Sequence, residues 1–401
     1  MNASPNDPRP RVLYVTHRVP YPPDKGDRIR NYHVLLELSK VARVWLAALA
    51  DEQVTEAQQA ALDKLCVRVA IIPVGGKSRW VKAGASLLSG KSLSEGLFNE
   101  GKLATQLSTW AAEANFHSSL ISASSLARYQ QLPALAKLPA HVDLVDVDSQ
   151  KWFDFADATR GPKSWLYRLE GKRIRKLEQS LANRASTLSL VSKAETDVFN
   201  GFTKPGAAIT ATNGVDLKYY QPMDNVPPQP ACAFVGAMDY FPNIDAAVWF
   251  AMEIHPHVRA SYPEAQFHII GRKPTAEVLK LGTLPGVQVL GTVPDVRPFV
   301  AAARLAVCPI RVARGLQNKV IEAMAMAKPV LSAPAAMAAL HAIPGVHLLR
   351  PTTVSEWVRA ICELWLDIDR REELGRAARG YVELYHDWPN CLAPLIQRVV
   401  A

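Results

Sequence analysis

Lys319 and Glu322, in the run GLQNKVIEAMAMAKPV at residues 315–330, are the side chains whose types and spacing best suit chemistry. A glycine loop precedes a predicted apolar helix, and residues three apart share one face of a helix. Backbone N–H groups at a helix N-terminus, with a lysine in the first turn, can bind a phosphate. A carboxylate one turn deeper can accept two hydrogen bonds from a sugar diol, so the pair predicts a nucleotide site. The alternative is an ordinary amphipathic helix with a solvated charged face.

A second candidate is the segment VDLVDVDSQKW, residues 142–152, in which Asp146 and Asp148 lie at the end of a predicted strand. Alternate residues of a strand point to the same face, so the two carboxylates should lie together. In that position Asp148 could act on an acceptor hydroxyl. Two alternatives stay open: a metal site, because Asp-x-Asp also binds metals in some sugar transferases, and capping of the next helix by Asp148 or Ser149.

Several loops after predicted strands combine glycine with basic residues. In the first loop, residues 20–28, prolines stiffen the chain and Gly26 lets the backbone approach a ligand. A rigid connection with solvated charges is the alternative there. In the second half, three predicted strands end at a glycine, the first of them at Gly236. Arg272 follows the second and could offset pyrophosphate charge, while the backbone near Val293 could contact a base edge.

Short apolar strands, each followed by a loop and usually a helix, must position these residues. We predict strands at 11–16, 41–48, 67–74, 119–123, 142–147, 188–192, 232–235, 267–270, 287–290, 305–309 and 329–332, and helices at 29–39 and 164–184. Strand, loop, helix, strand at this spacing is a βαβ unit. We therefore expect an α/β architecture of two doubly wound domains, with ligands at the carboxyl ends of the strands in the cleft between them. The Pro-rich stretch 222–230 reads as the linker, and Asn213-Gly214 as a tight turn.

Composition limits the classes of protein. A chain of 401 residues, 49% hydrophobic and 21% charged, is expected to be globular with two domains. No run is long and apolar enough to span a membrane and the N-terminus lacks an apolar signal region, so we expect a cytoplasmic protein. Five scattered cysteines argue against a zinc site or disulfides. The net charge of +9 suits nucleic acid, an anionic membrane or phosphate-bearing substrates; the absence of nucleic-acid motifs argues against the first.

Two segments combine basic and apolar residues in a way that suits an anionic membrane surface. They are residues 77–98, with Trp80 and Leu88, and residues 163–184, a predicted basic helix. Packing of these segments against the sheet of the first domain is the alternative, which we favour for the second segment.

Taken together, these strings resemble glycosyltransferases of the GT-B fold, in the retaining group called family 4. The strings NGVD, FVGAMDYFPN and EAMAMAKPV carry that likeness. More narrowly, VTHRVPYPPDKGDRIRNYH, VDVDSQKWFDFA, LVSKAETDVF and GLQNKVIEAMAM resemble the sugar transferases of exosortase/PEP-CTERM exopolysaccharide systems. The resemblance implies two facing Rossmann-like domains, an N-terminal acceptor-side domain at 1–205 and a donor domain at 206–384. It further implies a last helix, within 385–401, that crosses back to the N-terminal domain.

The same resemblance implies roles for particular residues. Glu322 would bind the donor ribose, Lys319 would lie near the diphosphate, and Gly26 would approach the phosphates or the acceptor. The implied donor-binding set is Gly26, Gly236, Arg272, Val293, Arg314, Gly315, Leu316, Gln317, Asn318, Lys319 and Glu322, and the implied catalytic set is Asp148, Lys319 and Glu322.

The sequence departs from the family pattern in three places. Arg314 stands where the first glutamate of the usual pair is expected, so the contact to the donor sugar must differ. Asn243 stands near the place of a common lysine, whose charge Arg272 could replace. The usual N-domain histidine is absent: Ser124 and Asp148 occupy the corresponding strand ends, and the nearby His17 and His117 are single histidines.

The resulting prediction is a hexosyltransferase that moves a sugar from a nucleotide-sugar donor to a glycan or lipid-linked acceptor, with retention at the anomeric carbon, in exopolysaccharide biosynthesis. We expect no metal, no other cofactor and no nucleic-acid partner, and a peripheral association with the inner membrane face. The alternatives are a nucleotide-sugar epimerase, which shares the fold, and a non-catalytic nucleotide-sugar-binding protein.

Overall fold

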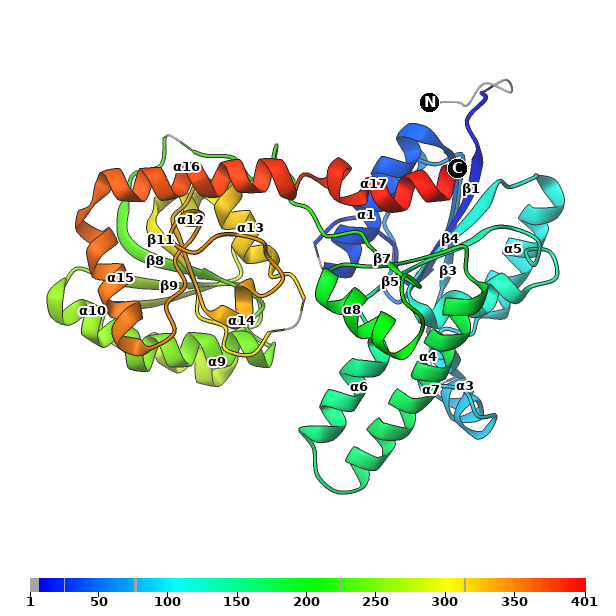
Figure 1. Cartoon of the computed structure of the whole chain (residues 1–401), viewed down its shortest axis with the longest axis horizontal. Helices are drawn as coiled ribbons and strands as arrows, with labels where there is room; N and C mark the ends of the chain where they lie inside the picture. Colours follow the sequence, from blue (N-terminus) through cyan, green and yellow to red (C-terminus); the bar gives the residue numbers. More distant parts are fainter. Residues whose placement is uncertain (1–6, 25, 76–77, 224, 314) are drawn as a thin grey trace. The chain divides into compact units, whose positions relative to one another are not determined.

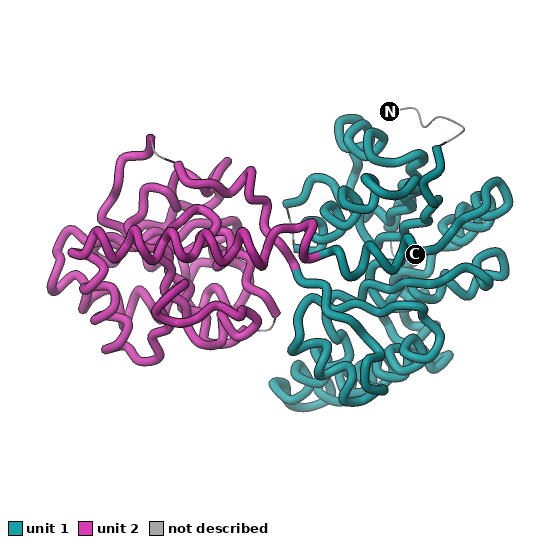
Figure 2. The backbone as a smooth tube through the Cα atoms, turned by 45° about the horizontal axis from the view of Figure 1, so that its top comes forward, with its two compact units in different colours: residues 1–212, 392–401 teal, residues 213–391 magenta. Residues whose placement is uncertain are grey.

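The computed structural model describes residues 7–24, 26–75, 78–223, 225–313 and 315–401. The chain forms two compact units, residues 1–212 with 392–401, and residues 213–391 (Figure 2). The sequence predicted domain boundaries at 205/206 and 384/385, a few residues before the observed ones at 212/213 and 391/392. The last helix, α17 (Trp388–Val400), begins in the second unit, and from Leu392 onward its residues belong to the first unit, as predicted.

The first unit is built on a parallel sheet with the strand order β3-β2-β1-β4-β5-β6-β7. Its strands are β1 (Arg11–Thr16), β2 (Arg43–Ala50), β3 (Arg68–Pro73), β4 (Ser118–Ser122), β5 (Ala140–Val145), β6 (Thr187–Leu190) and β7 (Ile209–Thr210). Its helices are α1 (Gly26–Val41), α2 (Glu56–Asp63), α3 (Ser78–Leu88), α4 (Leu93–Leu97), α5 (Gly101–Glu113), the 3-10 helix η1 (Ser124–Gln131), α6 (Asp148–Asp157), α7 (Pro162–Arg184) and α8 (Lys193–Phe202). Strands with long apolar runs, such as RVLYVT in β1, are buried on both faces, as parallel sheets require.

The second unit has a five-stranded parallel sheet in the order β10-β9-β8-β11-β12. The strands are β8 (Gln229–Val235), β9 (Gln266–Ile270), β10 (Val287–Gly291), β11 (Ala303–Cys308) and β12 (Val330–Ser332). The helices are α9 (Phe241–Trp249), the π-helix η2 (Phe250–Ile254), α10 (His255–Ser261), α11 (Ala276–Leu281), α12 (Arg297–Ala302), α13 (Asn318–Ala325), α14 (Pro334–Met337), α15 (Val354–Leu366) and α16 (Ile368–Tyr385). In Figure 1, α16 and α9 lie on opposite sides of this sheet, so it is covered on both faces. The predicted α/β fold with two doubly wound sheets is confirmed.

A buried polar network connects α1 to the sheet of the first unit. Arg30 donates to both carboxylate oxygens of Asp143 on β5, at 2.7 and 2.9 Å, and each of the two side chains is only 1% exposed. Ser189 on β6 donates to the same carboxylate at 2.8 Å. Because a buried charge is tolerated only when it is paired and hydrogen-bonded, this network specifies how α1 sits on β5 and β6.

Two sequence-based predictions about the connection between the units are wrong. Asn213-Gly214 is not a tight turn, since Val215 pairs in extended form with Asp387. Glycine is required at 214 for a different reason: a Cβ there would lie 2.8 Å from the backbone of Trp388. The Pro-rich stretch 222–230 lies inside the second unit and leads into β8, because the chain already crosses between units at residues 212–213.

Candidate donor site and acceptor-side residues

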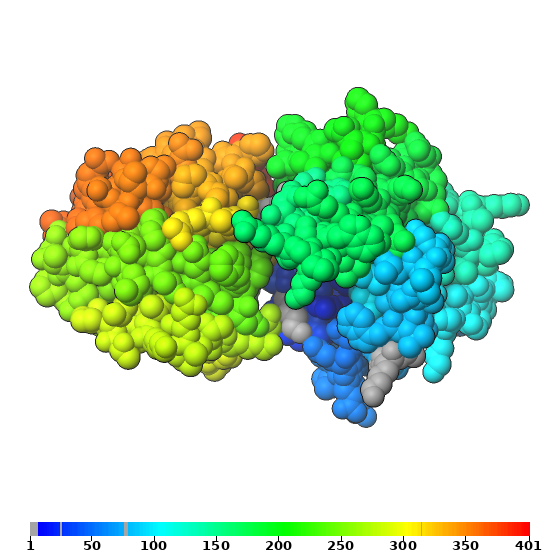
Figure 3. Space-filling model, turned by 90° about the horizontal axis from the view of Figure 1, so that it is seen from below, coloured from blue at the N-terminus to red at the C-terminus, as the bar shows by residue number. Residues whose placement is uncertain are grey.

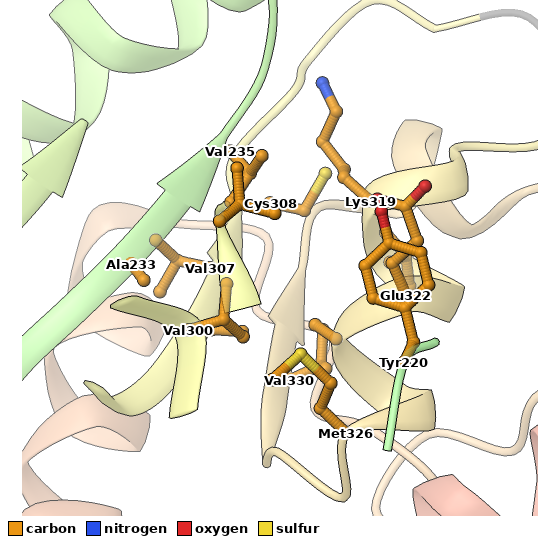
Figure 4. A pocket seen from close by; sticks show the side chains of 14 residues that line it. Tyr220, Ala233, Val235, Val300, Val307, Cys308, Lys319, Glu322, Met326 and Val330 are labelled. Atoms are coloured by element: carbon orange, nitrogen blue, oxygen red, sulfur yellow. The ribbon is translucent and has the colours of Figure 1, made fainter. Parts of the chain in front are cut away.

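Lys319 and Glu322 both line a small cavity in the second unit, between α13 and the ends of the central strands (Figure 4). The cavity wall is otherwise largely aliphatic, with Val235 from β8 and Cys308 from β11 opposite the helix. Its volume of about 20 Å³ has room for a single water. A larger ligand must therefore lie outside it, against the polar ends of Lys319 and Glu322. Since both side chains are partly buried, the alternative of a solvated charged helix face is wrong.

Lys319 is held by two residues that come from β8 and α9. Its Nζ donates to Oδ1 of Asn243 at 2.5 Å and lies 5.2 Å from the centre of the Phe234 ring. Asn243 is buried and its own Nδ2 donates to the carbonyl of Ala237 at 2.8 Å, which fixes the orientation of the amide. Burial lowers the pKa of Lys319, although Cys308 and Glu322 oppose that effect.

The glycine at 236 makes this arrangement possible. A Cβ at Gly236 would lie 2.9 Å from Cγ of Asn243 and 3.1 Å from Nζ of Lys319. A Cβ at Gly271 would overlap the carbonyl oxygen of Gly236, at 1.6 Å. The glycines that end two neighbouring strands are thus required by close packing at the carboxyl edge of the sheet, where the lysine side chain lies.

Glu322 faces Tyr220, a residue that the sequence analysis did not select. The Tyr220 hydroxyl donates a hydrogen bond to the Glu322 carboxyl, and Figure 4 shows its ring beside that side chain. Arg379 of α16 fixes the segment, because its Nη1 donates to the carbonyls of Tyr220 at 2.8 Å and Ala325 at 2.5 Å. Burial raises the pKa of Glu322 to about 7, while Lys319 and the Tyr220 hydrogen bond lower it. The carboxyl therefore titrates in the physiological range.

The start of α13 has no side-chain cap from its N-cap residue. Gly315 has a φ of 64°, which favours glycine. The N-cap residue Gln317 makes no side-chain capping bond, and its Nε2 donates instead to the carbonyl of Gly315 at 3.5 Å. Oδ1 of Asn318 is buried without a hydrogen-bond partner among the described residues. Leu316 is partly buried against the core of this unit, and Arg314 lies outside the described residues.

Arg272 and Val293 lie in the loops after β9 and β10, at the same sheet edge. Arg272 is exposed, and its carbonyl accepts from the backbone N–H of Met238 at 2.9 Å. Val293 is partly buried in an apolar cluster with Ile270. Neither residue lines the cavity that Lys319 and Glu322 share. Gly236 lies against Lys319, and Arg272 follows Gly271, which packs on Gly236.

In the first unit, Asp148 begins α6 and hydrogen-bonds on two sides. It accepts from Oγ of Ser124 at 2.9 Å and from Nζ of Lys151 at 3.4 Å, and Asp146 binds the same Nζ at 2.8 Å. The two carboxylates thus lie together as predicted, and the lysine ammonium occupies the place between them that a metal would need. Burial lowers the pKa of Lys151, but Asp148 and Asp146 outweigh it and raise the value overall.

The proposed helix capping by Asp148 or Ser149 is wrong. Val147 is the N-cap residue of α6 and makes no side-chain capping bond. Ser149 binds the carboxylate of Glu178 on α7 through its backbone N–H and hydroxyl. Glu178 therefore caps this helix from outside, a long-range contact that no local pattern shows.

The backbone is strained at the ends of β4 and β5, close to Ser124 and Asp148. Ala123 and Val145, which lie just after β4 and at the end of β5, have φ values of 82° and 69°. Such values are unfavourable for residues other than glycine, and most of all for a β-branched valine. Strain of this kind clusters at functional sites, which draws attention to the neighbouring Ser124 and Asp148.

The positions of the other first-unit candidates, Gly26, His17 and His117, say less about function. Gly26 is the exposed first residue of α1, and a Cβ there would meet nothing within 4 Å, so packing within the chain does not require glycine. His17 follows β1 and its Nε2 lies 3.4 Å from Oδ2 of Asp27. His117 precedes β4 and so lies at the opposite, amino-terminal edge of the sheet.

Within the described ranges, no group of three His, Cys, Asp or Glu residues is arranged to hold a metal ion. Among the same residues, no helix is both long and apolar enough to cross a bilayer. None of the five cysteines forms a disulfide, and Cys232, Cys308 and Cys391 are buried.

A protein-family model matches a large part of the second unit. Residues 229–367 match the family model described as Glycosyl transferases group 1. That range contains the glycine-ended strands, the cavity-lining α13 and both Lys319 and Glu322. No curated protein sequence matches the chain significantly.

Whole-chain matches to solved structures define the fold. Sucrose-phosphate synthase from Thermosynechococcus elongatus is 15% identical, with a TM-score of 0.69 over 97% of this chain and 98% of that one. Anabaena HepE in complex with UDP is 17% identical, with a TM-score of 0.65 over 96% and 98%. S. aureus TarM, in complex with fondaparinux, α-GlcNAc-glycerol and UDP, is 11% identical, with a TM-score of 0.66 over 98% and 100%. At such identities the likeness shows the fold, which is GT-B. The chain thus has a GT-B fold in which residues 229–367 match the glycosyltransferase group 1 model.

Proposed function

We propose that the protein is a retaining glycosyltransferase that uses a nucleotide-sugar donor bound by the second unit. The observation that carries the proposal is the convergence of Lys319 and Glu322 at one cavity, inside the range matched by the glycosyltransferase family model. A lysine beside an uncapped helix start suits a diphosphate, and a carboxylate one turn further suits a ribose diol.

In this proposal each residue of the second unit has a distinct task. Lys319, held by Asn243, neutralises charge on the departing nucleoside diphosphate, the step at which negative charge develops. Glu322 accepts hydrogen bonds from the ribose hydroxyls. Arg272 adds positive charge near the diphosphate, and Val293 contributes backbone at the base. Gly236 and the loop 315–318 allow the donor to approach the backbone closely.

On the acceptor side, we propose that Asp148 orients or deprotonates the acceptor hydroxyl, with Ser124 and Lys151 fixing its position. The acceptor is a glycan or a lipid-linked sugar, and Gly26, at the start of α1, approaches it or the phosphates. Retention, transfer of a hexose without a metal, and a role in exopolysaccharide biosynthesis rest on the sequence resemblance alone. A working place in the cytoplasm, at the inner face of the membrane, rests instead on the composition of the chain and on the basic and apolar segments 77–98 and 163–184.

The donor assignment can be tested with a panel of nucleotide sugars, scored by release of nucleoside diphosphate and by binding calorimetry. UDP and UDP-glucose are the first probes, because structures of Anabaena HepE contain them. Glu322→Ala should weaken binding by about 10- to 150-fold, since a charge-assisted hydrogen bond contributes about 1.5–3 kcal/mol. Glu372→Ala, which removes a carboxylate whose side chain is 64% exposed on α16, is the matched control and should change nothing.

Three outcomes separate the possibilities. Nucleoside diphosphate release that requires an acceptor supports transfer. Interconversion of the sugar without an acceptor would indicate an epimerase, and tight binding without turnover of any donor would indicate a binding protein. A Glu322→Ala variant with unchanged donor affinity and activity would refute the donor site itself.

A further inference from the structure

Helix α3 of the first unit presents three of its large apolar side chains to solvent. Trp80, Val81 and Leu88 are 65%, 71% and 92% exposed, whereas the residues that the helix buries are the small Ala83 and Ser86. Val81 and Leu88 are seven residues apart and so share one face of the helix, with Trp80 beside them. A surface helix normally turns its large apolar residues inward, so this orientation indicates that something else covers them.

The inward face of α3 cannot accommodate those large residues. α3 and α4 approach so closely that a Cβ at Gly96 would lie 2.6 Å from Cα of Ala83. Ser86 donates to the carbonyl of Ser92 at 2.8 Å, which closes the turn between the two helices. The apolar face of α3 is therefore held outward by packing on its other side.

Helix α7 places basic charge next to this apolar face. Both of its acidic residues are fully buried: Glu170 accepts from the N–H groups of Leu93 and Ser94 at the start of α4, and Glu178 caps α6. With its carboxylates turned inward, α7 exposes Trp165, Arg168, Lys172 and Lys176, which follow one another on a single stripe. The predicted packing of residues 163–184 against the first unit applies to the opposite face, where Ile174 and Leu181 are buried.

The two helices belong to one continuous surface. Arg173 of α7 donates to the carbonyl of Lys91 in the α3–α4 turn at 2.9 Å, and Glu170 holds the start of α4. Figure 3 shows the segment of α3 and α4 beside the α6–α7 hairpin on one side of the molecule. We call the exposed side chains Trp80, Val81, Leu88, Trp165, Lys172 and Lys176 the α3–α7 face.

We propose that the α3–α7 face docks the protein on the surface of an anionic lipid bilayer. Tryptophan rings and aliphatic side chains partition into the headgroup region, and lysines beside them attract anionic lipids. Association with a second copy through the same face would bring like-charged lysine stripes together. The lysines thus favour a negatively charged partner, and the large apolar side chains favour a partner with an apolar interior. An anionic bilayer has both properties along the whole α3–α7 face.

The test is co-sedimentation of the full chain with vesicles of phosphatidylcholine alone and with added phosphatidylglycerol. We expect binding to the anionic vesicles only, and weaker binding at high salt because the charges are exposed. Lys172→Gln with Lys176→Gln should weaken binding about 30-fold, since each basic residue near the surface contributes about 1 kcal/mol. Trp80→Ser with Leu88→Ser should weaken it at least about tenfold.

Matched control variants lie on the second unit. Leu366→Ser removes a side chain from a residue that is 72% exposed on α15, and Arg359→Gln with Arg376→Gln removes two charges whose side chains are 71% and 70% exposed. These variants should bind anionic vesicles like the unchanged protein. Circular dichroism spectra and thermal midpoints must agree among all variants, which shows that each one is folded. UDP binding, measured separately, reports on the donor site independently of the α3–α7 face.

Several results would overturn the proposal. These are the absence of vesicle binding, equal binding to neutral vesicles, and equal loss of binding in the control variants. Lipid-free self-association that Trp80→Ser with Leu88→Ser abolishes would assign the face to a second copy of the chain instead.

Discussion

The titration of Glu322 gives the sharpest test of the donor site. Burial raises the pKa of this carboxyl to about 7, with Lys319 and Tyr220 acting in the opposite direction. A carboxylate accepts hydrogen bonds from both hydroxyls of a ribose, whereas the protonated acid has lost part of that capacity. Donor binding should therefore select the ionised form and release a proton when the pH is below about 7.

The expected size follows from the ionised fraction. With a pKa near 7, about a tenth of the carboxyl is ionised at pH 6 and about nine tenths at pH 8, so affinity should rise about tenfold between them. Because burial lowers the pKa of Lys319, the affinity should fall again at higher pH as that residue loses its charge. A bell-shaped dependence is the expected profile.

Calorimetry with UDP-glucose is the suitable assay, because a diphosphate diester does not titrate between pH 6 and 8, unlike the terminal phosphate of UDP. Repeating the titrations in buffers of different ionisation enthalpy measures the released proton directly. Glu322→Gln keeps the shape but cannot ionise, so its affinity should be lower at pH 8 and independent of pH between 6 and 8. An unchanged tenfold rise in Glu322→Gln would refute the reasoning.

The same carboxyl should make the unliganded fold more stable at low pH. Its pKa in the folded chain lies above its ordinary value of 4.5, so the folded state binds the extra proton. The stabilising contribution is full below about pH 4.5 and is lost as the pH rises through about 7. The thermal midpoint of Glu322→Gln, relative to the unchanged protein, should accordingly be higher at pH 8 than at pH 5. A midpoint difference that does not vary with pH would argue against the raised pKa.

Three further predictions concern other residues. Gly236→Ala should lower UDP-glucose affinity about tenfold while the chain stays folded, because the new Cβ would displace Lys319; wild-type affinity by calorimetry would contradict this. Asp148→Asn should reduce kcat at least about 100-fold and leave the donor Kd unchanged. An equal loss of turnover and of donor affinity would argue against an acceptor role. Asp143→Asn leaves Arg30 buried without its partner charge and should lower the free energy of unfolding by about 3–5 kcal/mol in urea titrations; a loss under about 1 kcal/mol would show that the pair is dispensable.

The parts of this structure that local pattern controls could be predicted from the sequence. Short apolar runs, three of which end at a glycine, predicted the order of strands and loops along the chain, because buried parallel strands read as continuous apolar segments. The helix that carries Lys319 and Glu322 was predictable because both residues lie within one turn of each other. The glycine loop before that helix, which begins at Asn318, was predictable from the same sixteen-residue run.

The remaining parts depend on contacts between distant residues, which no local pattern encodes. Asn243 lies 76 residues from Lys319, and only the adjacency of β8 and β11 brings them together. Tyr220 reaches Glu322 because Arg379, far along the chain, holds its backbone. The Asn-Gly pair at 213–214 was misread for the same reason: its glycine serves close packing against Trp388 and not a turn.

The position of α17 has a consequence for how the chain folds during synthesis. Leu392, Leu395 and Val399 are fully buried, and Oγ of Ser118 on β4 donates to the carbonyl of Val399 at 2.6 Å. These residues complete the first unit, yet the ribosome makes them only after the whole of the second unit. The apolar strip of the first unit that these residues cover therefore stays exposed while the second unit is made, for about 10–40 s at ordinary elongation rates. During that interval the strip is exposed apolar surface of the kind that chaperones bind.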